Sequence, residues 1–299
     1  MNKLDLNSEV KCDFYIDSKR KKVWQEELNM TEIVKEICDK YDINYSLNGG
    51  SLLGAVRHRG FIPWDDDIDI MMLRKDYEKF LSVAEKELKE PYFLQYYKTE
   101  KGYYYGHAQI RNSYTTAFIK NDKFNNFNHG IFIDIFPLDN IPDDLNVRKI
   151  YLNKISKFKK ILSIYTVRSS DNYLKKLIKE VVFGIYWKIK NIDKELEKFE
   201  IECEKYNNVK TKECGAISFI QDGVKYDNSW FEDYIETDFE YLKLKIIKEY
   251  DSFLTRQYGD YMKIPKNKNG SLHGNVFFDT DKSYKEYEKN KEKIIKDLN

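Results

Sequence analysis

The sequence is poor in the residues that mark disulfide-stabilised, zinc-binding or membrane-spanning proteins. Its four cysteines, Cys12, Cys38, Cys203 and Cys214, are scattered and form no Cys-x-x-Cys pair. This spacing argues against a disulfide framework and against a zinc site, so we expect reduced thiols. The first residues lack the apolar core of a secretion signal, and no apolar run is long enough to span a bilayer. We therefore expect a cytoplasmic protein.

The sequence also lacks an excess of charge of either sign, because its formal net charge is only +1. This balance gives no bulk electrostatic reason to expect nucleic acid as a partner. The chain of 299 residues is long enough for one large domain or a domain with an insertion. We expect an N-terminal extension over 1–22, a catalytic core over 23–145, a helical insertion over 146–210 and a C-terminal helical and loop part over 211–299.

The most informative segment is the acidic stretch near residue 67. Asp65, Asp66, Asp67 and Asp69 lie among aliphatic and aromatic residues, and Asp67-Ile68-Asp69-Ile70 alternates charge with apolar side chains. Such alternation predicts a strand, over about 66–72, with Asp67 and Asp69 on one face. Two carboxylates on one face repel each other. A bound divalent cation, Mg²⁺ or Mn²⁺, usually offsets this repulsion. The pattern therefore predicts a metal site.

Other interpretations of the acidic stretch stay open. A solvated acidic loop would not be surrounded by apolar residues of this kind. An EF-hand loop would need a glycine and a distal glutamate at offsets that are missing here. An Asp-x-Asp site of a glycosyltransferase would keep the metal and the nucleotide and change only the transferred group.

A third carboxylate lies inside a second apolar run. Asp134 is enclosed by Ile133 and Ile135 in the segment GIFIDIFPLD, where an unpaired charge would be costly. A salt bridge to a core arginine would explain it structurally. A pair of carboxylates on one strand and a third on its neighbour is also the arrangement of a nucleotidyltransferase, or polymerase-β-like, palm. On that interpretation Asp67, Asp69 and Asp134 are both catalytic residues and metal ligands.

The expected elements support an α+β fold with a mixed sheet, flanking helices and a helical insertion. Apolar spacing predicts strands near 43–47, 66–72, 92–97, 103–111 and 115–120, and helices over 22–41, 52–56, 74–89, 145–205 and 240–258. The basic and aromatic stretch 177–192 could pack on the core or lie on an anionic membrane surface, and packing is favoured. Peripheral contact with the inner face of the cell membrane is the second expectation.

The residues before the acidic strand suit a phosphate-bearing ligand. Gly49, Gly50 and Ser51 form a predicted turn whose backbone N–H groups can approach phosphate closely. Arg57 follows this turn and is a candidate for bidentate binding to a donor phosphate. Arg111, after the strand at 103–110, is a second phosphate candidate. The alternative for Arg57, and equally for neighbouring Arg59, is a structural bridge to one of the aspartates.

Several motifs together resemble the LicD family. They are Gly49-Gly-Ser-Leu-Leu-Gly-Ala-Val-Arg-His58, Gly60-Phe-Ile-Pro-Trp-Asp-Asp-Asp-Ile-Asp-Ile70, Arg74-Lys-Asp-Tyr77, Phe132-Ile-Asp-Ile-Phe-Pro-Leu-Asp139 and Tyr258-Gly-Asp-Tyr-Met-Lys-Ile-Pro265. The resemblance covers residues 24–285. That family includes bacterial phosphocholine transferases, with fukutin and fukutin-related protein as distant relatives.

The resemblance implies a metal-dependent phosphotransferase. The expected donor is CDP-choline or another CDP-linked compound, and the expected acceptor is a sugar hydroxyl of a lipopolysaccharide, teichoic acid or capsule precursor, free or lipid-linked. A nucleotidyltransferase that releases pyrophosphate is the main alternative, and a non-catalytic glycan-binding protein is another. A choline head needs an aromatic box, but the sequence cannot choose among Tyr103, Tyr104, Tyr105 and Trp230. We expect the isolated His107, His129 and His273 to be structural.

Overall fold

The computed structural model describes residues 3–119, 126–166, 191–219, 224–266, 268 and 276–298. The helices are α1 (Ser18–Lys40), α2 (Gly49–His58), α3 (Arg74–Glu87), α4 (Leu145–Thr166), α6 (Ile192–Glu204), α7 (Tyr250–Tyr258) and α8 (Lys291–Asp297), with 3₁₀ turns η2 (Asn228–Phe231) and η3 (Tyr284–Asn290). The strands are β1 (Glu9–Lys11), β2 (Phe14–Ile16), β3 (Ser46–Leu47), β4 (Asp69–Leu73), β5 (Tyr92–Gln95), β6 (Ala108–Asn112), β7 (Thr116–Ile119), β8 (Ile131–Ile141), β9 (Glu213–Gly215), β10 (Tyr226–Asp227), β11 (Tyr234–Phe239), β12 (Leu242–Ile247) and β13 (Val276–Asp279).

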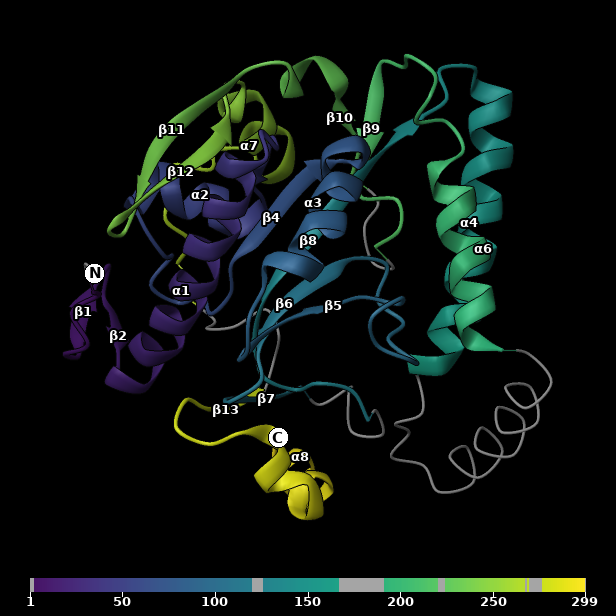
Figure 1. The fold of residues 1–299 in the computed structure, drawn as a ribbon. Coiled ribbons are helices and arrows are strands. Elements are labelled where there is room, and N and C mark those ends of the chain that lie inside the picture. The colour runs from purple at the N-terminus through teal and green to yellow at the C-terminus, as the bar shows by residue number, and fades with distance from the viewer. Residues whose placement is uncertain are drawn as a thin grey trace.

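A mixed sheet forms the centre of the protein (Figure 1). Its strand order is β10-β9-β8-β4-β3, and β8 also pairs with β6, which pairs with β5. The pairing of β4 with β8 is parallel, whereas the other pairings in this sheet are antiparallel. The long strand β8 therefore joins both halves of the sheet, which confirms the predicted mixed sheet with helices around it.

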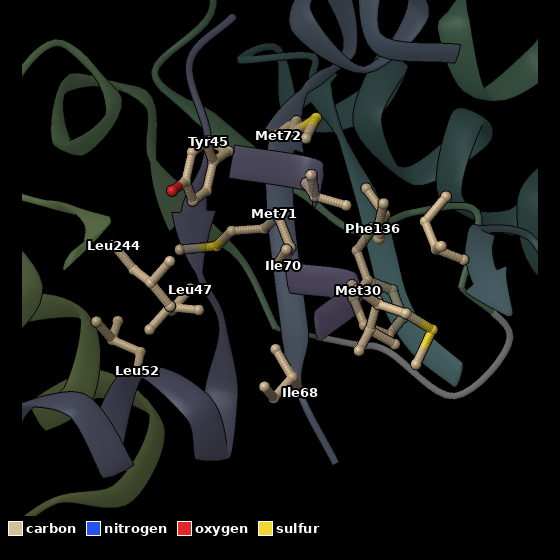
Figure 2. Packing of buried hydrophobic residues seen from close by; sticks show 14 of the residues in the cluster. Met30, Tyr45, Leu47, Leu52, Ile68, Ile70, Met71, Met72, Phe136 and Leu244 are labelled. Atoms are coloured by element: carbon tan, nitrogen blue, oxygen red, sulfur yellow. The ribbon is translucent and has the colours of Figure 1, made fainter. Parts of the chain in front are cut away.

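The core lies between this sheet and the helices that pack on it. Figure 2 shows Met30 of α1 beside Phe136 of β8, with Ile68 and Ile70 on the neighbouring segment that leads into and along β4. Ile68 and Ile70 are both fully buried, as the alternating pattern predicts. Burial of side chains of this size stabilises a fold by about 1.5–3 kcal/mol each. This packing anchors the acidic segment that precedes β4.

Four predicted elements differ from the structure, one of which is the strand predicted over 103–111, because β6 begins only at Ala108. The predicted strand over 66–72 begins only at Asp69, so Asp67 precedes β4. The predicted Gly-Gly-Ser turn is instead the first turn of α2. The predicted helix over 240–258 divides into strand β12 and helix α7, because alternate residues of β12 are buried as it pairs with β11. Gly259 does end α7, as expected from its position.

Two of the helices in the lysine-rich middle of the chain form a separate small core. Helices α4 and α6 bring together Tyr151, Leu162, Leu196 and Phe199 beside Ile141 at the end of β8. Figure 1 shows the two helices side by side at one end of the sheet. The stretch 177–192, for which packing or membrane contact was expected, lies outside the described residues except for its last two positions. Among the helices described, none is both long enough and apolar enough to cross a membrane.

Candidate active site

Helix α1 holds the acidic segment in place from one side. The Arg20 guanidinium donates a hydrogen bond of 2.8 Å to the backbone carbonyl of Asp65, and the Trp24 indole N–H donates one of 3.1 Å to the same oxygen. Trp24 also stacks on Phe61 with a ring separation of 4.5 Å. These contacts fix the backbone at Asp65, so α1 as well as β4 positions the carboxylates of the acidic segment.

The acidic segment gathers more carboxylates than the sequence analysis assigned to a metal. One oxygen each of Asp65, Asp66 and Asp67 lies within 4.8 Å of the others, whereas Asp69 and Asp134 are outside this group of three. Burial raises the pKa of Asp67, and the negative charge of Asp69 and then Asp65 raises it further. Asp65 and Asp66 are also buried, so three carboxylates lie close together in this segment.

A further carboxylate comes from α1. Glu27 is buried, and its Oε2 has no hydrogen-bond partner among the described residues. Burial raises the pKa of Glu27, and the nearby charges of Asp66 and Asp65 add to the effect. The sequence analysis missed this residue, because a glutamate within a helical pattern looks like any exposed helix residue. Its only sequence signal is its position on the same side of the helix as the apolar residues Trp24 and Leu28.

The beginning of α2 meets the acidic segment from the other side. Ser51 accepts a hydrogen bond of 2.8 Å from the backbone N–H of Asp69 through its hydroxyl oxygen. A Cβ atom at Gly50 would lie 2.5 Å from Asp65 Oδ2, so only glycine leaves room for that carboxylate. Gly49 has a φ of +49°, a conformation that favours glycine. Asn48, at the N-cap, makes no side-chain capping bond. Backbone N–H groups in the first turn of α2 can therefore donate hydrogen bonds to a phosphate.

Asp134 lies directly beside Asp69. The two residues are paired in the parallel register of β4 and β8, and Gln109 of β6 is paired with Asp134 on the other side. Asp134 Oδ1 accepts a hydrogen bond of 2.7 Å from Gln109 Nε2 and lies 2.8 Å from His107 Nε2. An amide and an imidazole therefore contact this buried carboxylate.

Arg111 differs from its predicted role as a phosphate ligand. Its side chain is fully buried, and its guanidinium donates to Gln109 Oε1 at 2.6 and 3.1 Å, to the Gly130 carbonyl at 2.7 Å and to Gln95 Oε1. Because these neutral oxygens enclose the guanidinium, it presents no face to a ligand. Its contact with Gln109 instead orients the amide that donates to Asp134.

Arg57, the other predicted phosphate ligand, contacts protein groups in the structure. Its Nη1 donates hydrogen bonds of 2.6 Å and 3.4 Å to the backbone carbonyls of Tyr261 and Lys263, and its Nε donates to His58 Nε2 at 2.9 Å. Burial and the adjacent Arg57 charge lower the pKa of His58 to about 4, so His58 accepts this bond as a neutral imidazole. Arg57 thus ties the segment after α7 to the end of α2.

That anchored segment brings Tyr258 to the acidic residues. A Cβ atom at Gly49 would lie 3.6 Å from both the Tyr258 hydroxyl and Asp69 Oδ2, so these two groups converge at the start of α2. Burial and the charges of Asp69 and Asp65 raise the pKa of Tyr258, which keeps it a neutral hydrogen-bond donor. The sequence analysis noted Tyr258 only within a C-terminal motif and assigned it no role.

The remaining aromatic and histidine candidates that the structure describes make contacts with residues other than the aspartates of the acidic segment. Tyr103 and Tyr104 are fully buried in a small cluster with Phe127. Trp230 lies under the Arg256 guanidinium at 4.2 Å. His129 lies 2.6 Å from Lys291 Nζ. His273 lies outside the described residues.

The residues around Asp67 fit a hard divalent cation. They offer several carboxylate oxygens within a few ångströms, a buried Glu27 oxygen without a partner in the described part of the chain, and a glycine that clears space for Asp65. Oxygen ligands of this kind suit Mg²⁺ or Mn²⁺. The identity of the ligands among Asp65, Asp66, Asp67, Asp69 and Asp134 stays a prediction.

Comparison with known proteins decides the family. A protein named lipopolysaccharide cholinephosphotransferase LicD, from Haemophilus influenzae, is 31% identical over 259 residues, which are 82% of this chain and 92% of that protein. The chain belongs to the LicD family. A family model described as LicD/FKTN/FKRP, nucleotidyltransferase domain, matches residues 42–164 of this LicD protein. That range holds the acidic segment, the start of α2 and Asp134.

Two shorter similarities are also found. Uncharacterized proteins of Rickettsia prowazekii and Rickettsia typhi are each 44% identical over 52 residues, which are 16% of this chain and 20% and 17% of those proteins. The names of these two proteins state no activity.

Proposed function

We propose that this LicD protein transfers phosphocholine from CDP-choline to a sugar hydroxyl of a cell-surface glycan precursor. The observation that carries the proposal is the pairing of Asp69 with Asp134 beside the first turn of α2, in a chain similar to a lipopolysaccharide cholinephosphotransferase over most of its length. Carboxylates and backbone N–H groups on one site suit a metal-bound diphosphate. A palm of the nucleotidyltransferase type would explain this arrangement.

A divalent cation would be held by Asp67 and Asp69, with Asp134 or the neighbouring Asp65 and Asp66 completing its ligands. Bound there, Mg²⁺ or Mn²⁺ supplies positive charge that neutralises the diphosphate. The Ser51 hydroxyl keeps the Asp69 backbone in place. Gly50 leaves the space that the Asp65 carboxylate occupies.

In the proposed reaction the acceptor oxygen attacks the phosphorus that carries choline. The bond from that phosphorus to the oxygen of CMP breaks, and CMP leaves with the electron pair. Asp134 accepts the proton of the acceptor hydroxyl, held toward it by Gln109 and His107. The choline ester stays intact and moves to the glycan. We further propose that the reaction takes place in the cytoplasm, where a lipid-linked acceptor would bring the protein to the inner face of the membrane.

Labelling of the donor tests which bond breaks. CDP-choline labelled in the choline-bearing phosphate should pass its label to the glycan, with unlabelled CMP released in equal amount. A metal clamp on a diphosphate can serve attack at either phosphorus, because the position of the acceptor decides the reaction. Release of labelled phosphocholine with CMP attached to the acceptor would instead establish nucleotidyl transfer. Release of pyrophosphate from CTP would indicate the classical nucleotidyltransferase reaction.

A further inference from the structure

Glu27 lies on the side of α1 that packs against the acidic segment. Arg20, Trp24 and Glu27 are spaced by four and three residues, so they project from one side of the helix. The first two of these side chains donate hydrogen bonds to the backbone carbonyl of Asp65. The Glu27 carboxyl group is therefore directed toward the same segment, about one helical turn further along α1.

The position of Glu27 is costly for an ionised carboxylate. The side chain is only 1% exposed, and its Oε2 has no hydrogen-bond partner among the described residues. Burial raises the pKa of Glu27 most, and the charges of Asp66 and then Asp65 raise it further, so both aspartates lie near it. The Arg20 charge opposes this shift, but the guanidinium donates its hydrogen bond to the Asp65 backbone carbonyl. A buried carboxylate in such surroundings needs a bound cation or a proton.

The whole region contains more negative charge than one divalent cation can offset. Six carboxyl groups lie in it, on Glu27, Asp65, Asp66, Asp67, Asp69 and Asp134. Mg²⁺ in an enzyme of this kind usually takes one or two carboxylates and completes its ligands with water and substrate phosphates. The strand partners Asp69 and Asp134, with Asp67, would already supply one such ion. The carboxyl groups on the α1 side then remain without a compensating cation.

We infer that a second divalent cation lies between α1 and the acidic segment, held by Glu27, Asp66 and Asp65. It is separate from the cation proposed at Asp67 and Asp69, whose ligands the carboxylate of β8 then completes. The inference rests on the proposed function for that first cation and adds a site beside it. Carboxylate oxygens of this kind suit Mg²⁺ or Mn²⁺. The second cation would offset the charge of Glu27 and hold α1 against the acidic segment.

Counting bound Mn²⁺ tests this site without any substrate. Electron paramagnetic resonance measures the free ion, and hence the number bound, for the wild type and for Glu27→Gln, Asp66→Asn and Asp69→Asn. Each amide keeps nearly the shape of the side chain and removes one charge. The matched control is Glu36→Gln, since Glu36 is exposed on the same helix. The melting temperature of each protein, with and without Mn²⁺, is the second measurement.

We expect the wild type and Glu36→Gln to bind two Mn²⁺ ions, and Glu27→Gln and Asp66→Asn to bind one each. Asp69→Asn should also bind one, because it removes a ligand of the other cation, and the double variant Glu27→Gln/Asp69→Asn should bind none. Without metal, Glu27→Gln should melt no lower than the wild type, because it removes a buried charge. Added Mn²⁺ should then raise the melting temperature of this variant by less than that of the wild type.

Three results would overturn the inference. The first is a wild type that binds only one Mn²⁺ ion. The second is a Glu27→Gln protein that still binds two, because a proton rather than a cation would then offset the Glu27 charge. The third is the loss of both ions in Asp69→Asn, because the carboxylates would then form a single metal centre. Should Glu27→Gln fail to fold, two ions in Asp66→Asn would reject the site in the same way.

These outcomes separate the second cation from the proposed reaction. One ion fewer in Glu27→Gln and Asp66→Asn, without release of CMP from CDP-choline by the wild type, would keep the second site and reject the function. Release of CMP by a wild type that binds one Mn²⁺ ion would keep the function and reject the second site.

Discussion

Asp69 and Asp134 are direct partners in the parallel pairing of β4 and β8. Paired residues of neighbouring strands project from the same face of a sheet. Two carboxylates that are 65 positions apart in the chain therefore lie side by side, next to the first turn of α2. This relationship brings the two strands together at one chemical site.

Loss of a carboxylate from the acidic segment should abolish turnover. Asp67→Asn and Asp69→Asn each remove a negative charge that a divalent cation needs, with little change in side-chain shape. We expect activity below detection in Mg²⁺ and an unchanged circular dichroism spectrum. Because Asp65 and Asp66 lie within ligand distance of Asp67, Asn at either position should also weaken Mn²⁺ binding, measured by electron paramagnetic resonance. Asp5→Asn, an exposed substitution, is the control, and near-native activity of Asp67→Asn would refute the metal assignment.

Asp134→Asn separates a chemical role from a structural one. Asparagine keeps an oxygen that can accept from Gln109 and His107, so the fold should survive. If the carboxylate accepts the acceptor's proton, kcat should fall by about 10²–10⁴-fold, the usual contribution of a general base. The melting temperature is measured on the same protein. A lowered melting temperature with full kcat at a permissive temperature would make Asp134 a structural residue.

Arg57 should act by holding the segment after α7 rather than by binding phosphate. Lysine keeps the charge at this position but cannot reproduce the guanidinium contacts with the Tyr261 and Lys263 carbonyls. We expect Arg57→Lys to speed hydrogen exchange of residues 260–264 and to lower kcat/KM by about 10- to 100-fold, because Tyr258 loses its fixed position. Arg59→Lys, at an exposed position two residues later, is the matched control. Unchanged exchange with a raised donor KM alone would restore Arg57 as a phosphate ligand.

Arg111 should be important for stability and only indirectly for activity. Arg111→Met would leave oxygens of Gln95, Gln109 and Gly130 without their donor inside the protein. Each buried acceptor left unpaired costs about 1–3 kcal/mol, so the free energy of unfolding should fall by about 3 kcal/mol or more. Urea denaturation measures this, with exposed Arg59→Met for comparison. An equally stable Arg111→Met protein with a weakened affinity for CMP would favour the ligand role that the sequence suggested.

Glu200 should make stability depend on pH. Burial raises its pKa to about 7, although the nearby Arg74 opposes the shift. Between its unfolded value of 4.5 and about 7 the native state therefore binds more protons than the unfolded state. The free energy of unfolding should then decrease as pH rises through this window and level off above it. Urea denaturation at several pH values should show a smaller decrease for Glu200→Gln, and an unaltered pH dependence in this variant would contradict the assignment.

The sequence by itself determined the acidic segment and its surroundings. Alternation placed Ile68 and Ile70 in the core, and both are fully buried. Apolar neighbours on both sides identified Asp134 as a carboxylate inside a strand, and β8 contains it. These conclusions held because they depend on local periodicity, which the sequence states directly. The same periodicity was available in Leu242, Leu244 and Ile246, where a helix was predicted in place of β12.

Only the tertiary structure decided which side chains meet at the site. Glu27 joins the aspartates because α1 crosses the end of the acidic segment, and Tyr258 joins them because Arg57 anchors a distant part of the chain. The two arginines illustrate the physical reason. A guanidinium can donate hydrogen bonds to phosphate oxygens and also to backbone carbonyl oxygens, so the residue type alone does not reveal its partner. The packing of distant segments left Arg111 enclosed by neutral oxygens and turned Arg57 toward the carbonyls of Tyr261 and Lys263.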